Sequence, residues 1–120
     1  AGTVLGLTLL DASGAFLGGQ LVPGLQLQLA SMGQGTVGLP CLTGSSDPGM
    51  DRFPQDTAAA MRQGVASSSL GVVLQALEIS GAELWLSGGD APVLAHALKE
   101  RSIPFHHDPD LVLKGLINRS

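Results

Sequence analysis

The stretch LWLSGGDAPVLAHAL, residues 84 to 98, changes from a strand-like to a helix-like pattern within a few residues. Its apolar start predicts a short buried strand, and Pro92 suits the first turn of a following helix. Glycines at the carboxyl end of a strand let backbone amides approach a ligand that any side chain would block. Gly88 and Gly89 therefore predict either a nucleotide-contacting turn or a plain tight turn in which Asp90 caps the helix.

The amino-terminal third predicts a hairpin followed by an ambiguous segment. Residues 4–10 and 15–22 are rich in strand-forming types and are separated by the turn-like DASG. In LQLQLASM, residues 25–32, the alternating leucines favour a strand, whereas the Gln, Ala and Met content favours a helix. We expect a helix there.

The middle and the end of the chain predict helices and extended segments in alternation. Gly, Pro, Ser and Asp accumulate over residues 33–54, which predicts a long surface loop that contacts a ligand or partner. Either Asp56 or Thr57 can cap a helix that runs to about Leu77. IPFHHDP, residues 103–109, reads as extended and residues 110–120 as helical. The order of elements predicts one α/β domain with a mixed sheet and flanking helices.

Composition narrows the function classes. The 120 residues are 44% hydrophobic and 13% charged, which indicates a globular domain with a core. The net charge is −4 and the six Lys and Arg are scattered, so we expect no direct contact with nucleic acid. No apolar run reaches the roughly 20 residues of a membrane span, and no signal-peptide pattern is present. A lone Cys41 fits a reducing, cytoplasmic compartment, and we expect it to be buried.

Three other clusters have simpler explanations than catalysis or metal binding. Adjacent side chains in the extended segment His106 to Asp108 point to opposite faces, so we expect no metal site there. The run Ser67 to Ser69 has no obvious base and suits close helix packing. Asp47 and Asp51 flank a loop glycine, which is typical of a solvated turn.

Several segments, taken in order, resemble the carboxyl-terminal half of type III pantothenate kinases, the family that includes the Bvg accessory factor-like proteins. The family's second phosphate motif, Asp-x-Gly-Thr followed by a hairpin, is similar to residues 1–19. The others are GGQLVPGLQLQLASM (18–32), GTVGLP (35–40), FPQDTAAAMRQGV (53–65), LWLSGGDAPVLAHAL (84–98) and DPDLVLKGL (108–116). The resemblance covers nearly the whole chain.

This resemblance implies the second half of an actin-like, ribonuclease H-like ATPase fold, and ATP-dependent phosphorylation of pantothenate, which opens coenzyme A synthesis. Gly2 and Thr3 would contact the ATP phosphates, the turn formed by Gly88, Gly89 and Asp90 would lie at the nucleotide, and Thr57 would bind pantothenate. The resemblance also implies Mg²⁺, a monovalent cation (K⁺ or NH₄⁺) and a homodimer. Gly18, Gly19, Pro23 and Gly24 resemble the family's structural and dimer-forming positions.

The chain also departs from the family pattern. The family's aspartate general base belongs to a Gly-x-Asp-Arg motif upstream of Ala1, so we expect an amino-terminal half to be absent here and the catalytic base to lie outside residues 1–120. The aspartate that helps bind the cation would also precede Ala1. Within the motif, Gly6 replaces the usual Thr and Thr8 the usual Asp, which removes a hydroxyl and a carboxylate.

Three hypotheses about the function of the chain therefore stay open. The chain is the carboxyl-terminal domain of a pantothenate kinase, a non-catalytic nucleotide- or partner-binding relative of the Bvg accessory factor type, or a dimerisation domain that binds no nucleotide. The first is our prediction, and the departures at Gly6 and Thr8 favour the second. A half-fold exposes an apolar edge, so we also expect self-association or pairing with the missing half.

Overall fold

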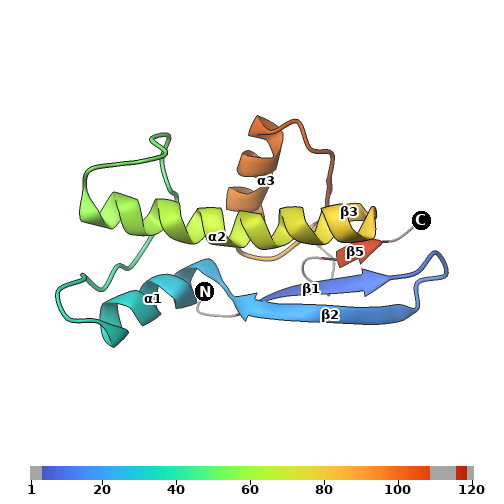
Figure 1. The fold of residues 1–120 in the computed structure, drawn as a ribbon, viewed down its shortest axis with the longest axis horizontal. Helices are drawn as coiled ribbons and strands as arrows, with labels where there is room; N and C mark the ends of the chain where they lie inside the picture. Colours follow the sequence, from blue (N-terminus) through green and yellow to red (C-terminus); the bar gives the residue numbers. More distant parts are fainter. Residues whose placement is uncertain (1–3, 109–115, 119–120) are drawn as a thin grey trace.

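The computed structural model describes residues 4–108 and 116–118 of the chain. In chain order, its elements are β1 (Val4–Leu10), β2 (Phe16–Pro23), α1 (Leu25–Gly35), α2 (Thr57–Ser80), β3 (Glu83–Leu86), α3 (Ala91–Glu100), β4 (His106–His107) and β5 (Leu116–Asn118). Figure 1 shows the long β1–β2 hairpin with α2 lying along it and α1 continuing from the end of β2. None of the described helices combines the length and the hydropathy that a membrane span requires.

The predicted hairpin is confirmed. β1 and β2 pair in antiparallel fashion, and Asp11 closes their connection, because its Oδ1 accepts from the backbone N–H groups of Ser13 and Ala15, each at 2.9 Å. Gly19 lies opposite Thr8, and a Cβ at Gly19 would come within 2.6 Å of the carbonyl oxygen of Leu7. Only glycine allows the two strands to approach this closely, which supports a structural role for Gly19.

The ambiguous segment is a helix, as predicted. Leu25 and Leu29, one helical turn apart, are each 1% exposed, whereas Leu27 is only half-buried. The burial therefore follows the helical spacing i, i+4 and not the strand spacing i, i+2.

The second helix is longer than predicted. α2 continues past Leu77 to Ser80 and ends where Gly81 adopts a left-handed conformation, with φ at +63° and its N–H bonded to the carbonyl of Leu77. The helix passes through Gly64 and Gly71 without a break, and a Cβ at either position would meet nothing within 4 Å. These two glycines are therefore not close-packing positions within the described chain.

The sheet is mixed, in the order β2-β1-β5-β3-β4. β5 runs parallel to β1 and antiparallel to β3, so the backbone of residues 116–118 bonds to a strand on each side. The predicted terminal helix is therefore wrong over Leu116–Asn118, and the rest of that prediction lies outside the described residues. Strand pairing of residues 116–118 provides hydrogen-bond partners for the backbone groups of β1 and β3. The helix propensity of the segment itself does not indicate this long-range pairing.

Two apolar clusters form the core. The larger joins Leu5 and Leu7 of β1, Leu84 and Leu86 of β3, and the inner faces of α2 and α3, so both helices cover the same face of the sheet. The smaller lies where α1 meets α2 and consists of Leu25, Leu29, Met61 and Val65, with Val93 of α3 packed against it. The start of α1 and the start of α3 thus border one cluster.

Candidate functional site

The Gly88 to Asp90 turn follows directly from the carboxyl end of β3. Ser87 is buried, Gly88 is half-buried with φ at +90°, and Gly89 is exposed. The φ of Gly88 lies in the region that L side chains rarely adopt, and a Cβ at Gly89 would meet nothing within 4 Å. The backbone of the turn therefore borders open space at Gly89.

Asp90 has a different role from the cap predicted for the helix that follows. It is the N-cap residue of α3, and its backbone carbonyl accepts from Leu94 N–H at 3.2 Å, but its side chain makes no cap hydrogen bond to α3. Its Oδ2 instead accepts from the backbone N–H of Leu25, at 3.0 Å, the first residue of α1. The side-chain cap that the sequence allowed as one alternative for this turn is therefore not formed, and the carboxylate instead bonds to the start of a helix 65 residues away.

Thr57 is the first residue of α2, and its side chain is exposed. The preceding Asp56 is the cap, since its Oδ2 accepts from Ala59 N–H at 3.0 Å. Of the two capping residues that the sequence allowed, the structure therefore selects Asp56. Thr57 places a hydroxyl at the positively polarised end of a long helix, where a negatively charged ligand group is favoured.

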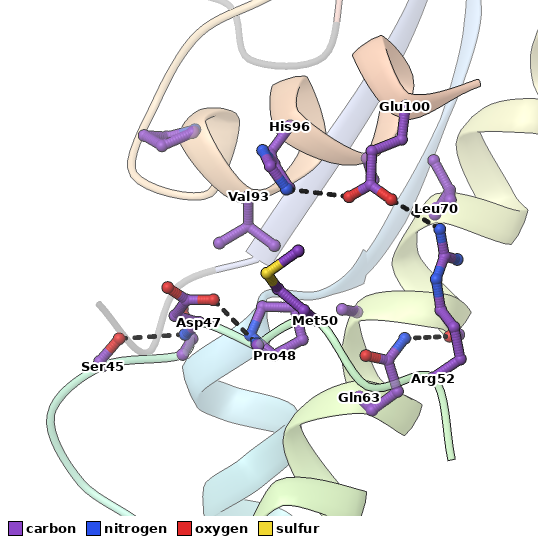
Figure 2. A pocket seen from close by; sticks show the side chains of 16 residues that line it. Ser45, Asp47, Pro48, Met50, Arg52, Gln63, Leu70, Val93, His96 and Glu100 are labelled. Carbon is purple, nitrogen blue, oxygen red and sulfur yellow. Dashed lines mark hydrogen bonds and ion pairs between the residues drawn. The ribbon is translucent and has the colours of Figure 1, made fainter. Parts of the chain in front are cut away.

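A cleft of about 420 Å³ lies between the loop at residues 45–52, α2 and α3. In Figure 2, Arg52 and His96 both point toward Glu100, at nitrogen to oxygen distances of 2.8 and 2.9 Å. The remaining lining residues are Ser45, Ser46, Asp47, Pro48, Gly49, Met50, Gln63, Ala66, Ser67, Leu70, Pro92, Val93 and Ala97. This cleft was not predicted, because Arg52 and Glu100 are 48 residues apart and neither belongs to a recognisable motif.

The loop at this cleft leads into α2 and Thr57. Asp47 and Asp51 accept from the backbone N–H groups of Gly49 and Phe53, at 2.9 and 3.1 Å, which is the local turn geometry predicted for them. The Arg52 side chain is half-exposed, so its ion pair with Glu100 contributes at most about 1 kcal/mol. It nevertheless connects the loop to α3.

The histidine pair lies in β4, at the edge of the sheet next to β3. The His106 ring stacks on Trp85 with ring centroids 4.3 Å apart. Across residues 4–108 and 116–118, no three His, Cys, Asp or Glu residues lie together in a way that could hold a metal ion. Of the serine run, Ser69 is buried and its Oγ accepts from Gln28 Nε2 at 3.0 Å, as the packing prediction requires. Ser67 and Ser68 are exposed, so that prediction was wrong for them.

Two further predictions concern Cys41 and the amino-terminal motif. Cys41 is exposed, so the expectation of burial was wrong. It lies beside Gly33, where a Cβ would approach the Cys41 sulfur to 2.8 Å. The loop packs Leu39 and Leu42 against the smaller apolar cluster, but not Cys41. Gly2 and Thr3 lie outside the described residues, as does most of the DPDLVLKGL segment.

Comparison with known proteins identifies the family of the chain. The family model for type III pantothenate kinase matches residues 1–78. Curated type III pantothenate kinases from Rhodopirellula baltica, Idiomarina loihiensis and Synechococcus sp. (strain JA-3-3Ab) are 39%, 35% and 34% identical to the chain. These alignments cover 98%, 97% and 97% of the chain and 45%, 46% and 50% of the relatives.

The chain therefore spans about half the length of the curated relatives it matches. The family model covers the hairpin, α1, the following loop and most of α2, and the alignments with the relatives extend over nearly the whole chain. The chain belongs to the type III pantothenate kinase family.

Proposed function

We propose that the protein transfers the γ-phosphoryl group of ATP to pantothenate, giving 4′-phosphopantothenate for coenzyme A synthesis, and that this chain supplies part of both sites. The similarity to type III pantothenate kinases along nearly the whole chain is the observation that carries the proposal. The Gly88 to Asp90 turn supports it, because ligands of α/β sheets bind outside the carboxyl ends of strands.

The proposed roles follow from what phosphoryl transfer requires. Catalysis of this reaction depends on positioning and on neutralising charge, so backbone amides and hydroxyls provide much of what is needed. We assign Gly2 and Thr3 to the phosphates, and Gly88 and Gly89 to the nucleotide, since the turn faces open space at Gly89. Thr57 would hydrogen-bond pantothenate, whose carboxylate suits a helix start.

We assign the fold to the actin-like class. The metal ion, the monovalent cation and the general base would be placed by other parts of that fold. Mg²⁺ would be held mainly by the substrate phosphates, with one or two carboxylates. The cation (K⁺ or NH₄⁺) would be bound by an aspartate ahead of Ala1. The general base is expected in the Gly-x-Asp-Arg motif of the amino-terminal half.

We also propose that this region pairs with a second protein surface, as a homodimer or with the amino-terminal half, in the cytoplasm. Phe16, Leu17 and Leu21 of β2 are between 50 and 78% exposed, and β2 forms an edge of the sheet. An exposed apolar edge strand favours association.

The proposal is tested on the full-length protein with Mg-ATP, pantothenate and K⁺ or NH₄⁺, by following ADP release and the mass of the product. Thr57→Val keeps the shape of the side chain and removes the hydroxyl. We expect it to raise KM for pantothenate by about tenfold, the effect of one hydrogen bond to a charged group. Thr36→Val, at another exposed threonine just after α1, is the matched control and should leave KM unchanged.

An unmodified protein that binds Mg-ATP but forms no phosphopantothenate would contradict the kinase proposal. That result would favour the accessory-protein alternative, which the replacements at Gly6 and Thr8 also suggest. Apart from these two replacements, no observation in the described residues favours that alternative.

A further inference from the structure

Asp90 bonds to the first turns of two different helices. Its backbone carbonyl accepts from Leu94 N–H of α3 at 3.2 Å, and its Oδ2 accepts from Leu25 N–H of α1 at 3.0 Å. It follows directly after Gly88 and Gly89 in the chain. The proposed nucleotide turn is therefore tied to the segment that leads from β2 into α1.

The start of α1 requires such a partner. Its N-cap residue is Gly24, which has no side chain to accept from the first N–H groups, and Leu25 itself is 1% exposed. A buried N–H without an acceptor destabilises the fold, because it loses its hydrogen bond to water. A carboxylate near the amino-terminal ends of α1 and α3 is also favoured by both helix dipoles.

The turn at Gly88 and Gly89 also needs a contact from outside to hold it in place. Gly88 and Gly89 have wide conformational freedom, and a Cβ at Gly89 would meet nothing within 4 Å. Within the turn, Ala91 N–H bonds to the Gly88 carbonyl at 3.2 Å. That bond closes the turn on itself but does not place it relative to α1, whereas the Asp90 carboxylate does.

We propose that Asp90 is a positioning residue that holds the Gly88–Gly89 backbone in its nucleotide-contacting place by bonding to the start of α1. The inference rests on the proposed function, since it assigns to the turn an ATP-binding role. Phosphoryl transfer depends strongly on the position in which ATP is bound. Because the turn is assigned to ATP, a small displacement of it weakens ATP binding more than pantothenate binding.

The test compares four variants of the full-length protein. Asp90→Ala removes the bond, and Asp90→Asn keeps one acceptor oxygen without the charge. Asp90→Ala combined with Gly24→Ser supplies α1 with its own local cap but does not restore the tie between the turn and α1. Asp11→Ala is the matched control, because it removes an exposed aspartate whose bonds are all local to the β1–β2 connection.

We expect Asp90→Ala to raise KM and Kd for Mg-ATP by about tenfold, to change KM for pantothenate less than twofold, and to lower thermal stability. Hydrogen exchange should rise at the amides of residues 25 and 88–91. Asp90→Asn should recover most of the ATP affinity, and the added Gly24→Ser should recover stability but not ATP affinity. Asp11→Ala should leave ATP affinity unchanged.

Two results would overturn the inference while leaving the proposed reaction intact. One is an Asp90→Ala protein with unchanged ATP affinity, and the other is full recovery of ATP affinity by Gly24→Ser, which would mean that Asp90 acts only on helix stability. A protein that binds ATP without phosphorylating pantothenate would refute the proposed reaction alone, because the Kd for Mg-ATP still tests Asp90. A protein that binds no ATP would refute both.

Discussion

The starts of α1 and α2 each donate a backbone hydrogen bond to an aspartate, but the two aspartates differ in their distance from the helix along the chain. At α2, Asp56 immediately precedes the helix and accepts from Ala59, three residues later. At α1, Gly24 immediately precedes the helix and has no side chain, and the acceptor is Asp90. The first cap is a local feature of the chain, whereas the second exists only when β3, α3 and α1 have come together.

This difference has a functional consequence. A local cap stabilises one helix and leaves the rest of the molecule unchanged. A cap supplied from a distance also fixes the relative position of two segments, and here one of those segments is the proposed nucleotide turn. The hydrogen bond from Leu25 to Asp90 joins these two segments.

The largest effect is expected at the buried side chain beside the distant cap. Leu25→Ala should lower the free energy of unfolding by about 2–5 kcal/mol, because Leu25 is 1% exposed in the smaller apolar cluster. Urea unfolding of the full-length protein measures this change. Ile79→Ala, at a side chain 76% exposed on α2, is the control and should cost less than about 0.5 kcal/mol. Equal losses in the two variants would mean that the start of α1 is not held by burial.

A smaller effect is expected at the local cap. Asp56→Ala should lower the free energy of unfolding by about 1 kcal/mol, because the Ala59 N–H loses its acceptor, and Asp56→Asn should lose less. Hydrogen exchange should increase in the first turn of α2 and stay unchanged at Gly88 and Gly89. Increased exchange at the glycine turn would show that the two caps are coupled, which contradicts the distinction drawn between them.

The smallest effect is expected at Asp11, the other local aspartate. Hydrogen bonds from the Ser13 hydroxyl and the Ala15 backbone hold the pKa of the Asp11 carboxyl below its ordinary value of 3.8. A lowered pKa in the folded protein stabilises it above the pKa of the unfolded chain, and this contribution is lost as the pH falls through the folded pKa. The difference in stability between the protein and its Asp11→Asn variant should therefore shrink below about pH 4, as unfolding at a series of pH values measures. A difference that stays constant through this range would contradict the prediction.

Local patterns predicted most of the elements correctly. The sequence predicted the hairpin, the three helices and the short strand before Gly88, since each depends on composition, spacing and turn residues within one segment. The helical assignment of residues 25–32 was confirmed, although the alternation of leucines pointed the other way. The end of α2 was misjudged by one turn because Gly81, and not an earlier breaker, ends it.

The site was predictable only in part. The bare backbone at Gly88 and Gly89 and the capping segment at Asp56 and Thr57 were identified from the sequence. The exposure of Cys41 was not, because it depends on which side chains of the 36–56 loop pack against the smaller cluster, and these are Leu39 and Leu42. The Arg52 and Glu100 pair was also not predictable, since it joins a loop to a helix through side chains that belong to no motif.

What the amino-acid sequence determines here is local: where the chain turns, which faces of its helices are apolar, and which glycines leave the backbone open. Its similarity to one enzyme family could also be recognised without coordinates. The tertiary structure alone decided that residues 116–118 form a strand between β1 and β3 and that the Asp90 carboxylate bonds to α1 instead of α3. Strand pairing and long-range hydrogen bonds depend on which segments meet in space, and the competition between possible partners is resolved only when the whole domain packs.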